Sequence, residues 1–86
     1  MTAFHVLLTR EAQEDVRRLA PEMRTRILDK LAWLGQNADM LRHQALQGDA
    51  WSGCFKYRVG DYRIIYQIDP AGPTLTVLKI GHRREV

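Results

Sequence analysis

The stretch CFKYRVGDYRIIYQID, residues 54–69, decides the fold predicted for this chain. It holds two runs rich in β-branched and aromatic residues. In both runs apolar positions alternate with polar ones, as in strands that bury one face. Gly60 and Asp61 separate the runs, and a pair of this kind between two strands predicts a tight hairpin turn. Because a two-residue turn fixes the pairing, the register of the hairpin follows from the sequence.

Alternation along this hairpin places its residues on two faces. One face is apolar and aromatic and carries Phe55, Tyr57, Val59, Tyr62, Ile64 and Tyr66. The other face carries Lys56, Arg58 and Arg63, with Arg58 directly opposite Arg63, a like-charge pair that costs roughly 0.2 to 1 kcal/mol. We interpret this cost as a sign that the face binds phosphate, whose oxygens match the planar fork of arginine. The alternatives are a solvated face that serves solubility, and a slipped turn that redistributes residues between faces.

The segments on either side of the hairpin predict further elements. Downstream, turn-forming residues at 69–73 precede a third run of strand-forming residues at 74–80. Upstream, residues 36–53 show no regular pattern and contain several turn-forming residues. We expect a loop there, pinned by three apolar side chains: Leu41, Leu46 and Trp51.

The N-terminal part predicts a short strand and two helices. Alternation at residues 4–8 indicates the strand, after which Thr9 can cap a helix. The apolar stripe of that helix consists of Ala12, Val16 and Leu19. Pro21 suits the first position of a second helix, and Gly35 is expected to end it. The apolar stripe of this second helix consists of Met23, Ile27, Leu31 and Leu34.

The resulting order, β-α-α-β-β-β, predicts an α+β fold with an antiparallel sheet and an N-terminal helical hairpin packed on one face. Each helix has to bury its apolar stripe, and the sheet is the large apolar surface available for it. A length of 86 residues leaves room for one domain, which we expect to span residues 1–86.

Charge and cysteine content narrow the classes of function. The net charge is +3, and its excess lies in residues 42–86, which hold seven basic and four acidic residues. The C-terminal half is therefore expected to face a polyanion. Cys54 is the single cysteine, which excludes an internal disulfide, and no spacing of Cys and His matches a metal site. No stretch resembles a signal peptide or a membrane span, so we expect a cytoplasmic protein without metal or cofactor.

A cluster of lysine and arginine on a sheet face can cleave RNA as well as bind it. RNA supplies its own nucleophile, the 2′-hydroxyl. The protein has to accept a proton, stabilise negative charge and protonate the leaving 5′-oxygen, and no metal is required. Arginine stays protonated and acts as an electrostatic stabiliser, whereas lysine can lose its proton, which makes Lys56 the candidate base. His82 is a second candidate for acid or base work, because imidazole titrates near neutrality.

Other chemically capable side chains are interpreted as structural. His5 and His43 have no third residue at a metal-binding spacing, and Cys54 has no histidine at a suggestive distance that would activate it. Trp33, near the end of the second predicted helix, is expected to pack. Trp51, in the predicted loop, could pack or stack on a base.

Three sequence segments together resemble the RelE/ParE toxin superfamily of type II toxin–antitoxin systems. They are Leu46-x-Gly48, the run CFKYRVGDYRIIY at 54–66, and the C-terminal run VLKIGHRREV at 77–86. The combination of G-D-Y-R-I-I-Y with a later G-H-R is specific, although each piece alone is weak. The predicted order of elements is similar too, and the resemblance covers nearly the whole chain.

The resemblance implies a metal-independent endoribonuclease that cuts mRNA in the ribosomal A site. It implies catalytic roles for Lys56, Arg58, Arg63 and Arg83, with Lys56 as proton acceptor and the arginines as stabilisers of the transition state. Further contacts to RNA or the ribosome are expected from Arg84, Lys79 and Arg42. The implied partners are the ribosome, mRNA and a cognate antitoxin of RelB-like or Phd/YefM-like type, with no membrane and no small-molecule cofactor.

One departure from the family pattern concerns the C-terminus. Active relatives commonly carry a tyrosine shortly after the G-x-R segment, and this sequence reaches Val86 before any such residue. We therefore expect either a natural residue or two beyond Val86, or an attenuated enzyme. Two other functions stay open: a ParE-like poison of DNA gyrase without nuclease activity, and an inactive toxin that only binds its antitoxin. Retention of all four cations favours the nuclease.

Overall fold

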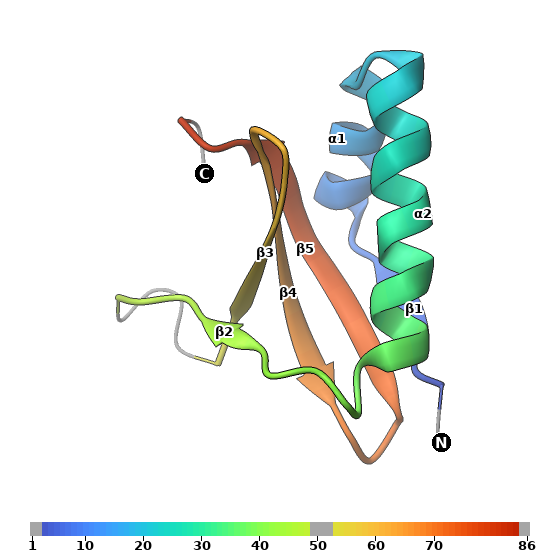
Figure 1. The fold of residues 1–86 in the computed structure, drawn as a ribbon, viewed down its shortest axis with the longest axis vertical. Coiled ribbons are helices and arrows are strands. Elements are labelled where there is room, and N and C mark those ends of the chain that lie inside the picture. The colour runs from blue at the N-terminus through green and yellow to red at the C-terminus, as the bar shows by residue number, and fades with distance from the viewer. Residues whose placement is uncertain (1–2, 49–52, 85–86) are drawn as a thin grey trace.

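The computed structural model describes residues 3–48 and 53–84, so the role expected for Trp51 lies outside the described residues. Within these ranges the chain forms a sheet with two helices on one face (Figure 1). The elements in chain order are β1 (His5–Leu8), α1 (Arg10–Arg18), α2 (Pro21–Asn37), β2 (Gln44–Ala45), β3 (Phe55–Val59), β4 (Tyr62–Asp69) and β5 (Thr74–His82). The α+β class and the helical hairpin on one face are as predicted. The short strand β2 lies within the segment that was predicted to be a loop.

The strands form one sheet in the order β1-β5-β4-β3-β2. Neighbours from β2 to β5 are antiparallel, whereas β1 lies parallel to β5, so the sheet is mixed rather than wholly antiparallel. Figure 1 shows the reason: α1 continues in the direction of β1, and α2 returns the chain to the end of the sheet at which β1 begins. β3 therefore runs in the direction of β1. β4 runs in the opposite direction, and β5 again runs in the direction of β1.

Both helix starts agree with the sequence. The hydroxyl of Thr9 accepts a hydrogen bond from the backbone N–H of Ala12 at 3.1 Å, which is the predicted cap of α1. Pro21 occupies the first turn of α2, where its missing N–H costs nothing. The connection between the helices is held by Arg24 of α2. Its guanidinium donates to three backbone carbonyls at the end of α1: those of Val16 (3.2 Å), Arg17 (3.1 Å) and Leu19 (3.1 Å).

Gly35 lies inside α2, which runs to Asn37, so the prediction that Gly35 ends the helix was wrong. A β-carbon at this position would lie 2.6 Å from Cγ2 of Val6 and 2.9 Å from the carbonyl oxygen of Phe4. The backbone N–H of Phe4 also donates to the carbonyl of Gly35 at 2.8 Å. Close packing of α2 on the start of β1, and not helix termination, therefore explains the glycine.

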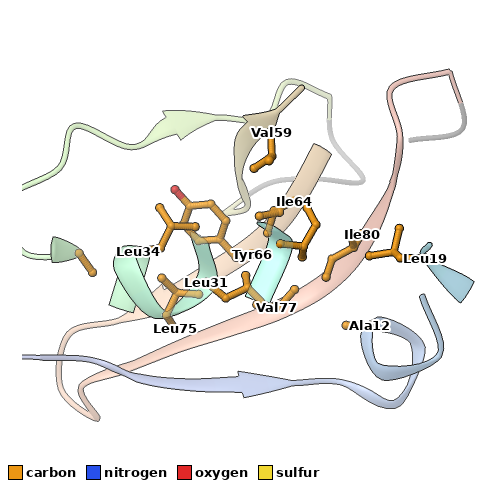
Figure 2. Close-up of a cluster of buried hydrophobic side chains, with 12 residues drawn as sticks. Ala12, Leu19, Leu31, Leu34, Val59, Ile64, Tyr66, Leu75, Val77 and Ile80 are labelled. Atoms are coloured by element: carbon orange, nitrogen blue, oxygen red, sulfur yellow. The ribbon is translucent and has the colours of Figure 1, made fainter. Parts of the chain in front are cut away.

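The core lies between the two helices and the side of the sheet that faces them (Figure 2). The helical layer contributes Ala12, Leu19, Ile27, Leu31 and Leu34, and the sheet contributes Val59, Ile64, Tyr66, Leu75, Val77 and Ile80. Both predicted helical stripes and the apolar face of the hairpin are therefore confirmed. The opposite face of the sheet points away from the helices (Figure 1).

The connection from α2 to β2 is fixed by His43. Its Nε2 lies 2.7 Å from the carbonyl oxygen of Ala38, and its Nδ1 lies 2.7 Å from the hydroxyl oxygen of Tyr66. Since a carbonyl only accepts, Nε2 donates to Ala38, and Nδ1 accepts from the hydroxyl of Tyr66. Burial of Tyr66, with a smaller contribution from nearby Tyr57, raises the pKa of Tyr66 to about 12. This histidine is structural, as expected from the sequence.

Candidate functional site

The register of the β3–β4 hairpin matches the sequence prediction. Arg58 lies opposite Arg63 and Val59 opposite Tyr62, with Gly60 at the turn. Gly60 has a φ of +59°. Among the described residues only glycines have a positive φ, so the φ of Asp61, the second turn residue, is negative. This combination is that of a type II′ turn, which needs glycine at its first central position. The turn therefore fixes the face on which the hairpin cations lie.

Lys56 and Arg58 differ in how the protein holds them. Nε of Arg58 donates to the carbonyl of Gly60 at 3.0 Å, so the turn itself orients an exposed guanidinium. Lys56 pairs across the hairpin with Ile65, an apolar residue that is only 1% exposed. Among the described residues the ammonium of Lys56 has no hydrogen bond and no ion pair. It is therefore available to a ligand on this face.

Arg63 and Arg83 come from neighbouring strands. Arg63 lies opposite Gly81, which has no side chain to compete for the space on that face. The backbone N–H of Arg83 donates to the carbonyl of Asp61 at 2.8 Å, which extends the β4–β5 ladder by one rung. Arg83 is exposed and follows directly after His82, the last residue of β5. By register, Lys56, Arg58 and Arg63 fall on the face away from the helices.

A bulge in β5 determines which side chains of this strand face the helices and which face away from them. The β4–β5 register shifts by one residue between Ile65 and Tyr66, which face Lys79 and Val77, so that Leu78 is the extra residue. Before the bulge Val77 points into the core, and after it Ile80 does. Lys79 therefore falls on the outer face. The carbonyl of the bulged Leu78 accepts a hydrogen bond from the hydroxyl of Thr9 at 3.0 Å, which holds the bulge in place.

The bulge also separates His82 from the cations. His82 pairs with Tyr62 on the helix side of the sheet, and their ring centroids lie 5.7 Å apart in an edge-on contact. Its Nδ1 accepts a hydrogen bond from the backbone N–H of Arg84 at 3.3 Å. His82 lines a pocket of about 330 Å³ together with Asp15 and Arg18 of α1. The structure therefore does not bring this predicted acid or base to Lys56.

The three basic residues expected to make further RNA contacts are dispersed. Lys79 is on the outer face, but its ammonium forms an ion pair with Glu11 of α1 at 3.0 Å. Arg42 is exposed in the connection that leads to β2, and Arg84 is exposed just beyond β5. No interaction within the described chain joins Arg42 or Arg84 to the four cations.

Sequence patterning does not reveal that α1 supports the end of β5, directly before Arg83. β1 pairs with the edge of β5 only as far as Val77, and α1 also packs against β5. The carboxylate of Asp15 accepts a hydrogen bond from the backbone N–H of Ile80 at 2.9 Å. This contact joins residues 65 positions apart, so local patterning could not have revealed it. α1 thus fixes the end of β5, next to Arg83.

Comparison with known proteins places this geometry in a family. The family model described as ParE toxin of type II toxin-antitoxin system, parDE, matches residues 6–86. Toxin RelG of Mycobacterium tuberculosis is 26% identical over 83 residues, which cover 96% of this chain and 94% of RelG.

Solved structures agree with this fold. The toxin–antitoxin complex RelBE2 from M. tuberculosis contains a chain that matches with a TM-score of 0.85 and 26% identity, covering 96% of this chain and 94% of that one. The archaeal RelE–RelB complex from Pyrococcus horikoshii OT3 matches with a TM-score of 0.78 and 20% identity, covering 99% and 100%. Both matches come from toxin–antitoxin complexes. Neither helix in the described part of this chain has the length and apolarity needed to cross a membrane.

Proposed function

We propose that this chain, which belongs to the ParE toxin family of type II toxin–antitoxin systems within the RelE/ParE superfamily, is an endoribonuclease that cuts mRNA in the ribosomal A site. The observation that carries the proposal is that Lys56, Arg58 and Arg63 share one helix-free face of the sheet, with the exposed Arg83 directly after β5. A gathering of positive charge on central strands suits a phosphodiester and the additional negative charge of its transition state.

In the proposed reaction Lys56 accepts the proton of the 2′-hydroxyl. The 2′-oxygen forms a bond to the adjacent phosphorus, and the bond from phosphorus to the 5′-oxygen breaks, which leaves a 2′,3′-cyclic phosphate. The guanidinium groups of Arg58, Arg63 and Arg83 stabilise the phosphorane-like transition state. We assign the proton taken up by the leaving 5′-oxygen to solvent, because His82 faces the helices.

The proposed partners are the ribosome, its mRNA and an antitoxin of RelB-like or Phd/YefM-like type. Two features support the antitoxin: family membership, and the fact that the RelBE2 and Pyrococcus relatives are described as toxin–antitoxin complexes. An antitoxin that covers the cationic face would exclude RNA from it.

Induced expression in cells with mapping of mRNA 5′ ends tests the nuclease. We expect growth arrest and cuts positioned within codons for the wild type, and neither for Arg63→Ala. Arg10→Ala removes an exposed arginine from α1 and should behave as wild type. Intact mRNA in the presence of wild-type protein would contradict the proposal.

Poisoning of DNA gyrase is the second candidate, because the matching family model is described as a ParE toxin. A supercoiling assay with purified gyrase separates the two functions. Inhibition of supercoiling by the wild type, together with intact mRNA in cells, would favour this alternative.

A further inference from the structure

One row of the sheet carries two lysines on the face that points away from the helices. Lys56 of β3 pairs with Ile65 of β4, and Ile65 pairs in turn with Lys79 of β5. Neighbouring strands lie about 4.8 Å apart, so the backbones of the two lysines are about 10 Å apart. Their side chains therefore rise from the same face on opposite sides of Ile65.

The next row towards the hairpin turn adds the arginines. Arg58 pairs with Arg63, and Arg63 pairs with Gly81, which has no side chain. Arg63 and Ile65 are two residues apart on β4 and therefore share a face. A phosphate bound over Ile65 would have a lysine on each of two opposite sides and Arg63 on a third.

In-line attack at phosphorus needs proton-transfer groups on two opposite sides. The 2′-oxygen enters on one side of the phosphorus, and the 5′-oxygen leaves on the other. With Lys56 as the base on one side, the group that protonates the leaving oxygen belongs on the side of Lys79. His82 faces the helices, and arginine holds its proton too firmly, whereas lysine can release one. The geometry of the row therefore favours Lys79 for the second proton transfer.

Lys79 differs from Lys56 in its surroundings. Its ammonium lies 3.0 Å from the carboxylate of Glu11 in the first turn of α1, whereas Lys56 has no ion pair among the described residues. An opposite charge beside a lysine favours its ammonium form, which a proton donor needs. The side chains are 30% exposed for Lys79 and 63% for Glu11, and ion pairs as open to solvent as this are weak. A bound phosphate can therefore replace Glu11 as the partner of a protonated Lys79.

We propose that Lys79 is the general acid of the cleavage reaction and protonates the leaving 5′-oxygen. When the bond from phosphorus to this oxygen breaks, its electron pair stays on the oxygen, and Nζ of Lys79 donates a proton to it. The resulting neutral amine regains a proton from water, so solvent is the final source of that proton. This inference rests on the nuclease proposed above and supplies the donor for its second proton transfer.

The test compares two RNA substrates that differ in one atom. Both are ribosome-bound mRNAs, and one carries sulfur in place of the 5′-oxygen at the bond that the wild type cuts. An alkoxide needs a proton in order to leave, whereas a thiolate is stable without one, because thiols are far more acidic than alcohols. Loss of a general acid therefore slows cleavage of the oxygen substrate and leaves cleavage of the sulfur substrate nearly unchanged.

Methionine variants of the three lysines in this sequence supply the comparison, because methionine keeps a similar stem without the ammonium. Lys79→Met should cleave the oxygen substrate about a hundredfold or more slowly than wild type in single turnovers, and the sulfur substrate within about threefold of wild type. Lys56→Met should be slow with both substrates, because the 2′-hydroxyl still has to lose its proton. Lys30→Met, on α2, is the matched control and should equal wild type with both.

Two further measurements complete the design. Lys79→Arg keeps the positive charge and should still cleave the oxygen substrate at least tenfold more slowly than wild type, because arginine is a poor proton donor. Circular dichroism checks that every variant is folded.

An oxygen-substrate rate of Lys79→Met within threefold of wild type would overturn the inference and leave the proposed nuclease unaffected. Equal slowing with both substrates would also overturn it, because Lys79 would then act by its charge alone. Rescue of Arg83→Ala by sulfur, without rescue of Lys79→Met, would assign the acid to Arg83. Absence of cleavage of either substrate by the wild type would overturn the nuclease itself, and the inference with it.

Discussion

Replacement of Tyr66 by phenylalanine tests how the connection between α2 and β2 is held. Tyr66 is 1% exposed, and its hydroxyl donates to Nδ1 of His43 at 2.7 Å. Phenylalanine would leave that nitrogen without its donor in a partly buried place. Loss of such a partner costs about 1–3 kcal/mol, so we expect the free energy of unfolding at pH 7 to fall by that amount.

The same residue predicts a dependence on alkaline pH. Its folded-state pKa of about 12 lies above the ordinary value of 10.0, so folding favours the neutral phenol. The resulting stability is complete below pH 10 and is lost as the pH rises towards 12. The rise of the pKa from 10.0 to about 12 corresponds to about 2.7 kcal/mol of folding stability. Tyr66→Phe has no phenol to ionise, so the variant should not lose this stability as the pH rises.

Urea unfolding followed by circular dichroism at several pH values between 7 and 11.5 measures both effects. Wild type should lose stability above pH 10 more steeply than Tyr66→Phe, and the difference between the two should narrow. Tyr57→Phe is the matched control for the measurement at pH 7, because the hydroxyl of Tyr57 makes no hydrogen bond among the described residues. Equal stability of Tyr66→Phe and wild type at pH 7, with parallel curves above pH 10, would show that the hydroxyl of Tyr66 does not stabilise the fold.

Two further predictions concern packing and the site. Gly35→Ala should lower the free energy of unfolding by about 1–3 kcal/mol in urea titrations, because its β-carbon would overlap Val6 and Phe4; an unchanged midpoint would mean that α2 can move away from β1. His82→Gln should leave the rate of mRNA cleavage within about threefold of wild type, because the ring packs on Tyr62 on the helix side. A loss of about a hundredfold or more, as expected for removal of a general acid or base, would return His82 to the catalytic group.

The hairpin could be predicted from sequence because its determinants are local. Gly60 and Asp61 fix the turn, and the turn fixes every pair from Val59–Tyr62 outward. The placement of the hairpin cations on one face follows directly. The caps at Thr9 and the start of α2 were predictable for the same reason, since each depends on neighbours within a few positions.

The features that the sequence did not reveal depend on contacts between distant segments. The bulge at Leu78 changes which residues of β5 face the core, and it is held by the hydroxyl of Thr9, 69 positions away. Strict periodicity from Val77 would place Lys79 on the core face and His82 on the outer face, which is the reverse of what the bulge produces. Gly35 was misread because a glycine near the end of a helical pattern predicts termination as readily as it predicts close packing on a strand.

Cleavage of a ribosome-bound mRNA by purified protein, followed under single-turnover conditions, is the direct test of the proposed nuclease. We expect codon-positioned cuts that require the ribosome. The rate should fall by about 10²- to 10⁴-fold in Lys56→Ala and stay unchanged in Arg10→Ala. Absence of cleavage by the wild type, or equal rates for wild type and Lys56→Ala, would contradict this proposal.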